Sequence, residues 1–251
     1  GAHESALLQR SPVLKRPVPA HLQVKAQGHP PGVSRKPLKM ALMGPYDSGT
    51  HLLLETLRLN FPRKVADACA HNSVFIEDWL NHCRVWKHAL NITQPYYRGE
   101  EPLITVLENR KEIPAETVLV TLIRSPLALI NSWKRTPYEL SPCLDRPADE
   151  FNQSCSAVGL TWDQNGDHDR QGGSRLRFSS SMEIYNEYLR SYKRLEEEAG
   201  LHRTVQVKYE DLVYTPEEVV ATIAQAMHWT VPRELNLVHA PAKDHGHAVG
   251  R

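Results

Sequence analysis

From Pro37 onward the hydrophobic residues form two kinds of pattern, and together these predict an α/β fold. Continuous apolar runs, LKMALMG (38–44) and TVLVTLIR (117–124), are typical of strands buried on both faces of a parallel sheet. Runs with apolar residues at helical spacing follow them, as in SPLALINSWKR (125–135). Since strands that alternate with helices build parallel sheets, we expect a three-layer fold around a central, mainly parallel sheet.

The same patterns predict the remaining elements. Helices are expected over 50–60, over SSSMEIYNEYLRSYKRLEEEAG (179–200), and in TPEEVVATIAQAM (215–227). In the last of these, Thr215 and Glu218 have the spacing of a capping box. Strands are expected at RVWKHAL (84–90) and TVQVKYEDLV (204–213), whereas LITVLENR (103–110) fits a helix or a strand edge.

Two segments show neither the strand-like nor the helix-like pattern of hydrophobic residues. Residues 1–36 contain many prolines and basic residues and few large apolar ones, which predicts a linker or stem ahead of a domain at 37–251. Residues 136–179 are rich in Pro, Asp, Gly and Ser, and predict a long loop. Long loops in compact domains usually have a function or are disordered, and we expect ligand specificity to reside in this loop and at Tyr96, Tyr97 and Arg98.

Composition narrows the classes of function. The 251 residues suit one domain, with 41% hydrophobic and 24% charged residues, as in ordinary globular proteins. The formal net charge of +1 argues against bulk electrostatic capture of nucleic acid. Any anion site must therefore be local. No apolar run in the sequence is long enough to span a membrane, and no membrane span is expected.

The cysteines give no sign of a metal site. They lack CxxC spacing, and we expect reduced thiols, with two disulfides as the alternative; the residues are Cys69, Cys83, Cys143 and Cys155. Two glycosylation triplets, at Asn91 and Asn152, and the proline-rich segment would fit an enzyme of the Golgi lumen. A glycan on Asn91 would crowd His88, however, so the cytoplasm is preferred.

A phosphate-binding loop is predicted by GPYDSGTH (44–51), which joins a strand to a helix. In this P-loop-like geometry, backbone N–H groups and the helix N-terminus converge on an anion. The glycines have GxxxxG spacing, but Thr50 and His51 follow where nucleotide hydrolases carry a lysine and a hydroxyl. Magnesium–ATP chemistry is therefore disfavoured. A loop of hydroxyls and N–H groups suits a less charged transferred group, such as sulfuryl, and a purely structural turn is the alternative.

A second pair of anion ligands is predicted on the next strand and helix. Arg124 ends the strand at 117–124, and Ser132 lies about two turns into the following helix. A guanidinium and a hydroxyl so placed can converge on one phosphate, which the arginine binds as a fork.

The loop, the Arg124–Ser132 pair and VKYEDLVYTPEEVVATIA (207–224) together resemble the sulfotransferases that use 3'-phosphoadenosine 5'-phosphosulfate. The resemblance covers roughly residues 38–230 and implies a metal-free enzyme. It assigns Arg124 and Ser132 to the donor's 3'-phosphate. It assigns the 5'-phosphosulfate to the loop, through Gly44, Ser48, Gly49, Thr50 and His51.

Asp47 departs from that family, many members of which carry Lys or Arg at this position. An acid near a dianionic donor is repulsive unless a base pairs with it. We therefore expect Asp47 to face away from the donor or to take part in acceptor binding, and another cation to supply the missing charge.

The predicted base and cation lie in VWKHAL (85–90), which resembles a Trp-Lys-His element of a sulfotransferase subgroup. His88 is expected to be the general base and Lys87 the cation, although neighbours on a strand point to opposite faces. His51 is the competing base. The predicted activity is sulfuryl transfer to a hydroxyl or amine of a small-molecule or carbohydrate acceptor. The alternatives are a small-molecule kinase and a nucleotide-binding module without catalysis.

Overall fold

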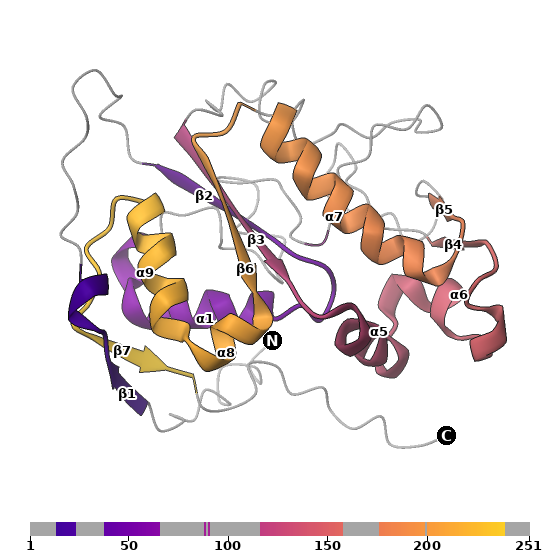
Figure 1. The fold of residues 1–251 in the computed structure, drawn as a ribbon, viewed down its shortest axis with the longest axis horizontal. Coiled ribbons are helices and arrows are strands. Elements are labelled where there is room, and N and C mark those ends of the chain that lie inside the picture. The colour runs from indigo at the N-terminus through magenta and orange to yellow at the C-terminus, as the bar shows by residue number, and fades with distance from the viewer. Residues whose placement is uncertain are drawn as a thin grey trace, which may run out of the picture.

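The fold is α/β, with three parallel strands at its centre. The computed structural model describes residues 14–23, 38–65, 88, 90, 116–157, 176–198 and 200–238. The parallel sheet has the order β2–β3–β6, formed by Lys39–Met43, Thr117–Ile123 and Arg203–Lys208 (Figure 1). The apolar runs at 38–44 and 117–124 are thus confirmed as strands, and β3 is the middle one.

Helices connect and flank these strands. The α-helices are α1 (Thr50–Asn60), α2 (Pro62–Val65), α5 (Pro126–Arg135), α6 (Ser141–Leu144), α7 (Ser181–Glu198), α8 (Tyr209–Tyr214) and α9 (Pro216–Ala226). The short 3-10 helices are η1 (Ala20–Leu22), η4 (Tyr138–Leu140) and η5 (Ala148–Glu150). The helices predicted at 50–60, 125–135, 179–200 and 215–227 are all present.

Side-chain alternation along the strands divides the core into two clusters. Met40 and Leu42 of β2 pack with α1 and α9, whereas Ala41 and Met43 pack with α5 and α7. Leu119 of β3 likewise points to the second face, and its neighbours point to the first. Because both faces of β2 and β3 are covered, these strands are apolar runs. Strand β6 instead alternates buried valines with less buried residues. Figure 1 shows α1 and α9 on one side of the strands and α7 on the other.

The prediction of a linker at 1–36 is wrong for the segment 14–23. Leu14–Pro17 forms strand β1, which pairs antiparallel with β7 (Glu234–Leu237). Val18 follows it and is buried in the core of the domain. The side-chain amide of Asn60 also anchors β7, since it exchanges hydrogen bonds of 2.8 and 2.9 Å with the backbone of Asn236. The domain therefore begins before Pro37.

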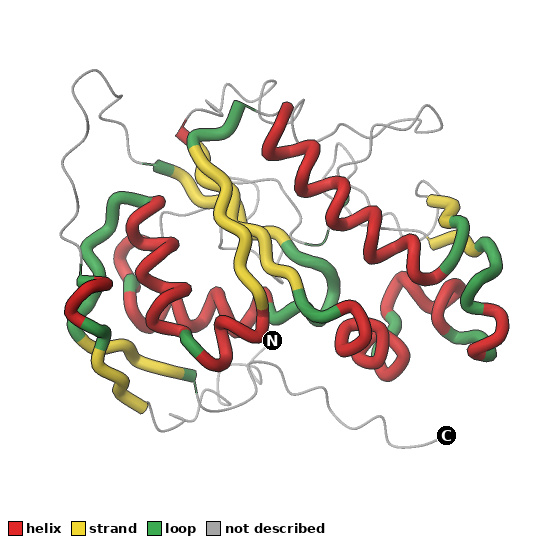
Figure 2. The backbone as a smooth tube through the Cα atoms, in the orientation of Figure 1, coloured by secondary structure: helices red, strands yellow, loops and turns green. Residues whose placement is uncertain are grey.

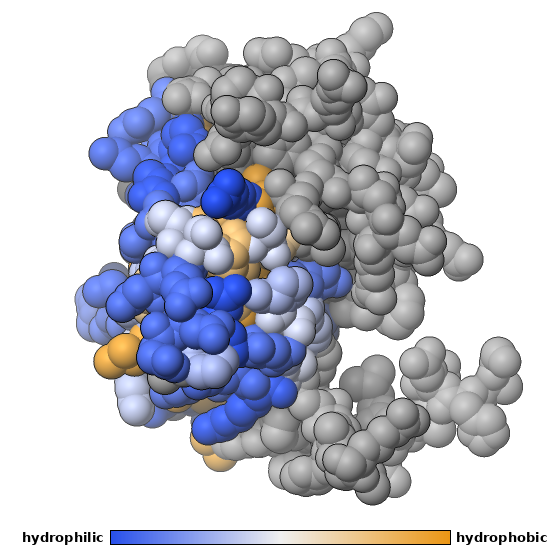
Figure 3. Space-filling model, turned by 90° about the vertical axis from the view of Figure 1, so that its right-hand side faces the viewer, coloured by the Kyte–Doolittle hydropathy of each residue, from blue (hydrophilic) through white to orange (hydrophobic). Residues whose placement is uncertain are grey.

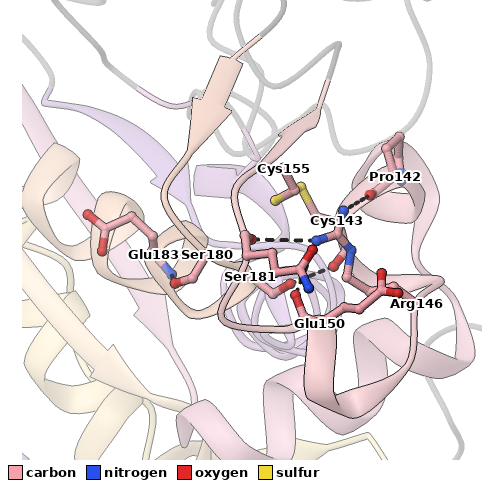
Figure 4. Close-up of a disulfide and its surroundings, with 9 residues drawn as sticks. Pro142, Cys143, Arg146, Glu150, Cys155, Ser180, Ser181 and Glu183 are labelled. Atoms are coloured by element: carbon pink, nitrogen blue, oxygen red, sulfur yellow. Dashed lines mark hydrogen bonds between the residues drawn. A yellow bond between two sulfur atoms is a disulfide. The ribbon is translucent and has the colours of Figure 1, made fainter.

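The described part of the long loop predicted at 136–179 contains regular structure. It contains η4, α6, η5 and an antiparallel pair, β4 (Cys155–Ala157) with β5 (Leu176–Phe178). A disulfide joins Cys143 of α6 to Cys155 of β4, and the Ser181 hydroxyl donates to the Cys143 carbonyl at 2.5 Å (Figure 4). The expectation of reduced thiols is wrong for this pair. Disulfides of this kind persist mainly in oxidising compartments.

The strand predicted at 204–213 is too long. Strand β6 ends at Lys208, and Tyr209–Tyr214 forms the short helix α8. The capping box is not formed either, because Thr215 both follows α8 and precedes α9. Its hydroxyl donates back to the Asp211 carbonyl at 3.3 Å instead of capping α9.

Two predicted strands cannot be placed in full. Of 84–90, only His88 and Leu90 are described, and His88 lies in a turn. The segment 103–110 lies outside the described residues. Within the described residues, none of the helices has the length and apolar character needed to cross a membrane. In the view of Figure 3 the described surface is mostly hydrophilic, and its hydrophobic residues form small areas.

Removing the disulfide tests how much it stabilises the described part of the segment 136–179. The bond closes a loop with a sequence separation of 12, so Cys143→Ala with Cys155→Ala should lower the free energy of unfolding by about 2–3 kcal/mol. Urea unfolding measures the loss. Mass spectrometry without reduction should find the two cysteines joined in protein from its native source. Two free thiols at these positions in that protein would contradict the bond.

Candidate anion-binding site

The register of the sheet brings the predicted motifs to one edge. Met43, the last residue of β2, is level with Thr121 of β3, and Ile123 of β3 is level with Lys208 of β6. The strands are parallel, so the loop after β2, Arg124 after β3 and Tyr209 after β6 leave the sheet at the same edge. Figure 2 shows the carboxyl ends of the strands lying side by side. In open α/β sheets this edge is the usual place for a ligand.

Two glycines shape the loop after β2. A Cβ on Gly44 would lie 2.5 Å from the Ser48 hydroxyl oxygen and 2.9 Å from the Leu122 carbonyl oxygen, so no larger residue fits between these strands. Gly49, the residue before α1, has φ +97°, which favours glycine. A Cβ there would lie 2.5 Å from the Tyr209 ring. The loop therefore packs directly on the residue that follows β6.

The hydrogen bonds within the loop assign separate roles to its residues. Ser48 is fully buried, and its N–H and hydroxyl both donate to the Pro45 carbonyl, at 3.2 and 2.8 Å. Ser48 thus holds the turn. The N–H groups of Gly49 and of the first turn of α1, which includes Thr50 and His51, have no acceptor within the helix. They are the backbone donors that an anion at this helix end would meet.

Helix α5 holds the same loop through two neighbouring residues. The Trp133 indole N–H donates to the Tyr46 carbonyl at 2.7 Å, and Trp133 is fully buried. The Ser132 hydroxyl donates to the Asp47 carboxylate at 3.1 Å. The Asp47 side chain therefore does not face away from this region. Its carboxylate is hydrogen-bonded to Ser132, one of the two predicted phosphate ligands.

Arg124 lies against the same loop. One of its Nη1 hydrogens is donated to the Asp47 carbonyl at 3.1 Å, and the guanidinium stacks 4.4 Å from the centre of the Tyr209 ring. Its Nε is buried without a hydrogen-bond partner in the described part of the chain. No ion pair to Arg124 is found there either. A half-buried guanidinium whose contacts are all to neutral groups is a local positive charge suited to an anion.

Glu210 and Tyr185 hold the backbone around Arg124. The Glu210 carboxylate accepts from the Ser125 N–H at 3.1 Å, at the start of α5, where the helix dipole favours an acid. The Tyr185 hydroxyl donates to the Arg124 carbonyl at 3.2 Å. Burial, with a further contribution from the charge of Glu210, raises the pKa of Tyr185. The phenol therefore stays protonated and remains a donor.

His88 lies directly on the loop. Its Nδ1 is 2.7 Å from the Gly44 carbonyl oxygen, and its ring stacks on Tyr46 with centroids 4.5 Å apart. A carbonyl can only accept, so Nδ1 carries the proton, and the lone pair of the neutral ring is on Nε2. The Tyr188 hydroxyl donates to the His88 carbonyl at 2.9 Å. This buried histidine is thus held in the tautomer that a general base needs.

Most of the predicted site residues come together, and one cannot be placed. Gly44, Ser48, Gly49, Thr50, Arg124, Ser132 and His88 lie in or against one loop, as the contacts above describe. His51 is the half-buried second residue of α1, so it also lies beside the loop. Lys87, the predicted cation, lies outside the described residues.

The sequence prediction gave no role to Tyr209, Glu210 or Tyr185. Tyr209 and Glu210 belong to the KYEDL motif, so the signal was present in the sequence. Both come directly after a strand, as Arg124 does, and parallel strands end at a common edge. Tyr185 carried no such signal, because its contact depends on how α7 packs. The chain matches no protein-family model, no curated protein and no solved structure.

Substituting Gly49 tests the packing of the loop on Tyr209. Gly49 and Gly200 both have positive φ, but a Cβ on Gly200 meets nothing within 4 Å. Gly200→Ala should therefore lower the free energy of unfolding only by the backbone strain, about 1 kcal/mol. Gly49→Ala should cost about 2–4 kcal/mol, because the clash with the Tyr209 ring is added to the strain. Equal losses in urea unfolding would show that Tyr209 does not lie against Gly49.

Proposed function

We propose that the protein is a sulfotransferase, which moves a sulfuryl group from 3'-phosphoadenosine 5'-phosphosulfate to a hydroxyl or amine of a small-molecule or carbohydrate acceptor. The observation that carries the proposal is that four separate segments, one of them the loop itself, meet at one place. The loop at 44–51, the Arg124–Ser132 pair, Tyr209 and His88 all lie at the carboxyl edge of the sheet.

This convergence supports the proposal because the parts fit the two ends of such a donor. Arg124 and Ser132 would bind the 3'-phosphate, since a guanidinium without an ion pair and a hydroxyl are suitable ligands for it. The backbone N–H groups of Gly49, Thr50 and His51 would bind the 5'-phosphosulfate. In this interpretation β2, the loop and α1 are a P-loop-like unit of a three-layer fold.

His88 would supply the base. Its Nε2 takes the proton of the acceptor hydroxyl or amine while the acceptor atom forms a bond to sulfur. The bond between sulfur and the bridging oxygen of the donor breaks in the same exchange, and adenosine 3',5'-bisphosphate leaves. The N–H groups of the loop stabilise the charge that develops on the leaving phosphate. Lys87 is the proposed cation beside the transferred group.

Two other functions use the same loop. A small-molecule kinase would need a cation after Gly49, where Thr50 and His51 stand, so it fits less well. A nucleotide-binding module without catalysis has one observation in its favour: the Asp47 carboxylate lies on Ser132. Binding without turnover of the donor across an acceptor library would distinguish this module from the enzyme.

Ligand-dependent thermal stability tests donor binding. Adenosine 3',5'-bisphosphate should raise the melting temperature, and ATP with magnesium should raise it much less. Arg124→Ala should weaken bisphosphate binding by about 10²-fold or more, because the fork to a phosphate is lost. Arg135→Ala is the matched control, since it removes the same charge from the exposed last residue of α5, the helix that follows Arg124. Equal affinities in the two variants would remove Arg124 from the site.

A pair of His88 variants tests the base. His88→Ala and His88→Asn should each lower turnover by about 10²-fold while donor affinity changes little, because both lack Nε2. Asn places an N–H near the position of Nδ1, so it can keep the bond to the Gly44 carbonyl. Its thermal stability should therefore exceed that of His88→Ala. If His51→Ala shows the loss of turnover and His88→Asn does not, His51 is the base.

A further inference from the structure

Asp47 contacts both of the proposed 3'-phosphate ligands, Ser132 and Arg124. Its carboxylate accepts the Ser132 hydroxyl proton at 3.1 Å, and its carbonyl accepts from Arg124 at 3.1 Å. The backbone at Asp47 has φ +56°, a left-handed conformation that is uncommon for residues other than glycine, asparagine and aspartate. The turn thus directs the Asp47 carboxylate to Ser132 and the Asp47 carbonyl to Arg124, the two groups that would bind an anion.

The contact with Ser132 excludes a second acceptor. A serine hydroxyl has one proton, so it cannot donate to the Asp47 carboxylate and to a phosphate oxygen at once. Arg124 has no such limit, because a guanidinium has five N–H donors and only one bond to Asp47 is present. The carboxylate also repels a dianion that approaches the pair. Binding must therefore break the Ser132–Asp47 bond.

We propose that the Asp47 carboxylate is an internal competitor for this site, which the 3'-phosphate of the donor displaces from Ser132. The inference rests on the proposed function, since it names what competes with the donor at that site. Asp47 then determines the affinity and the selectivity of the site. It penalises a ligand that places an anionic group beside Ser132, and only a ligand that bonds both Arg124 and Ser132 recovers the loss.

Two substitutions separate the charge of Asp47 from its hydrogen bond. Asp47→Asn removes the charge and tolerates the left-handed backbone, but it keeps an oxygen that can accept from Ser132. Asp47→Gly removes both charge and acceptor at a φ that suits glycine. Calorimetric titration with adenosine 3',5'-bisphosphate should show affinity increased about tenfold in Asp47→Asn, and by at least as much in Asp47→Gly.

A second aspartate provides the matched control. Asp145 also accepts a hydrogen bond from a serine hydroxyl, that of Ser141, on a different element. Asp145→Asn removes the same unit of charge and should leave the affinity unchanged. A ligand control is adenosine 5'-monophosphate, which lacks the 3'-phosphate. Its affinity should change much less than that of the bisphosphate in both Asp47 variants.

The outcomes separate this inference from the proposed function. If the wild type binds the bisphosphate and both Asp47 variants bind it equally well or more weakly, the competition is overturned and donor binding stands. If neither the wild type nor the variants bind it, the proposed function itself is overturned. Binding by the variants alone would support both, with the carboxylate then closing the wild-type site almost completely. A gain that is equal for the monophosphate would overturn the assignment of Asp47 to the 3'-phosphate.

Discussion

The pairing of β3 with β2 and β6 is the constraint on which the candidate site depends. A slip of one residue in a strand exchanges its two faces, which would move Leu119 from the α5–α7 cluster to the α1–α9 cluster. Such a slip is costly, because the described residues of β2 and β3 are almost all buried, and because in β6 it would expose Val205 and Val207, which alternate with less buried residues. The core therefore fixes the register, and the register makes Arg124 and Tyr209 leave the sheet side by side. Packing far from the loop thus determines the geometry of the loop.

Each of the two acids near Arg124 accepts a hydrogen bond from a neutral donor. Asp47 accepts from the Ser132 hydroxyl and Glu210 from the Ser125 N–H, whereas Arg124 itself contacts a carbonyl and an aromatic ring. An ion pair would neutralise the guanidinium and hold it closed against a ligand. Contacts to neutral groups orient it and leave its charge effective. The guanidinium of Arg124 is thus oriented by a carbonyl and an aromatic ring.

The sequence predicted the elements whose pattern is local. The strands at 38–44 and 117–124 and the helix Thr50–Asn60 follow from apolar runs and helical spacing alone. Strand β1 could not be predicted, because its partner β7 is at the other end of the chain and three of its four residues are two basic residues and a proline. The convergence of Arg124 and Ser132 on the loop was predictable from their positions after a strand. That Asp47 is their common partner was not, because this contact needs the left-handed turn at Asp47 and the packing of α5 at the same time.

An acid at position 47 changes what a loop of this kind selects. A base there would attract any anion, so affinity would follow charge. With an acid bonded to Ser132, the negative charge of a ligand lowers its affinity. The ligand must instead supply acceptors for the Ser132 hydroxyl and the Arg124 guanidinium. The loop then discriminates by the number of correctly placed oxygens, which a phosphate monoester has and a lone monoanion lacks. This loop therefore differs from phosphate-binding loops in general in two ways: it lacks the lysine, and it has an aspartate that is hydrogen-bonded to Ser132.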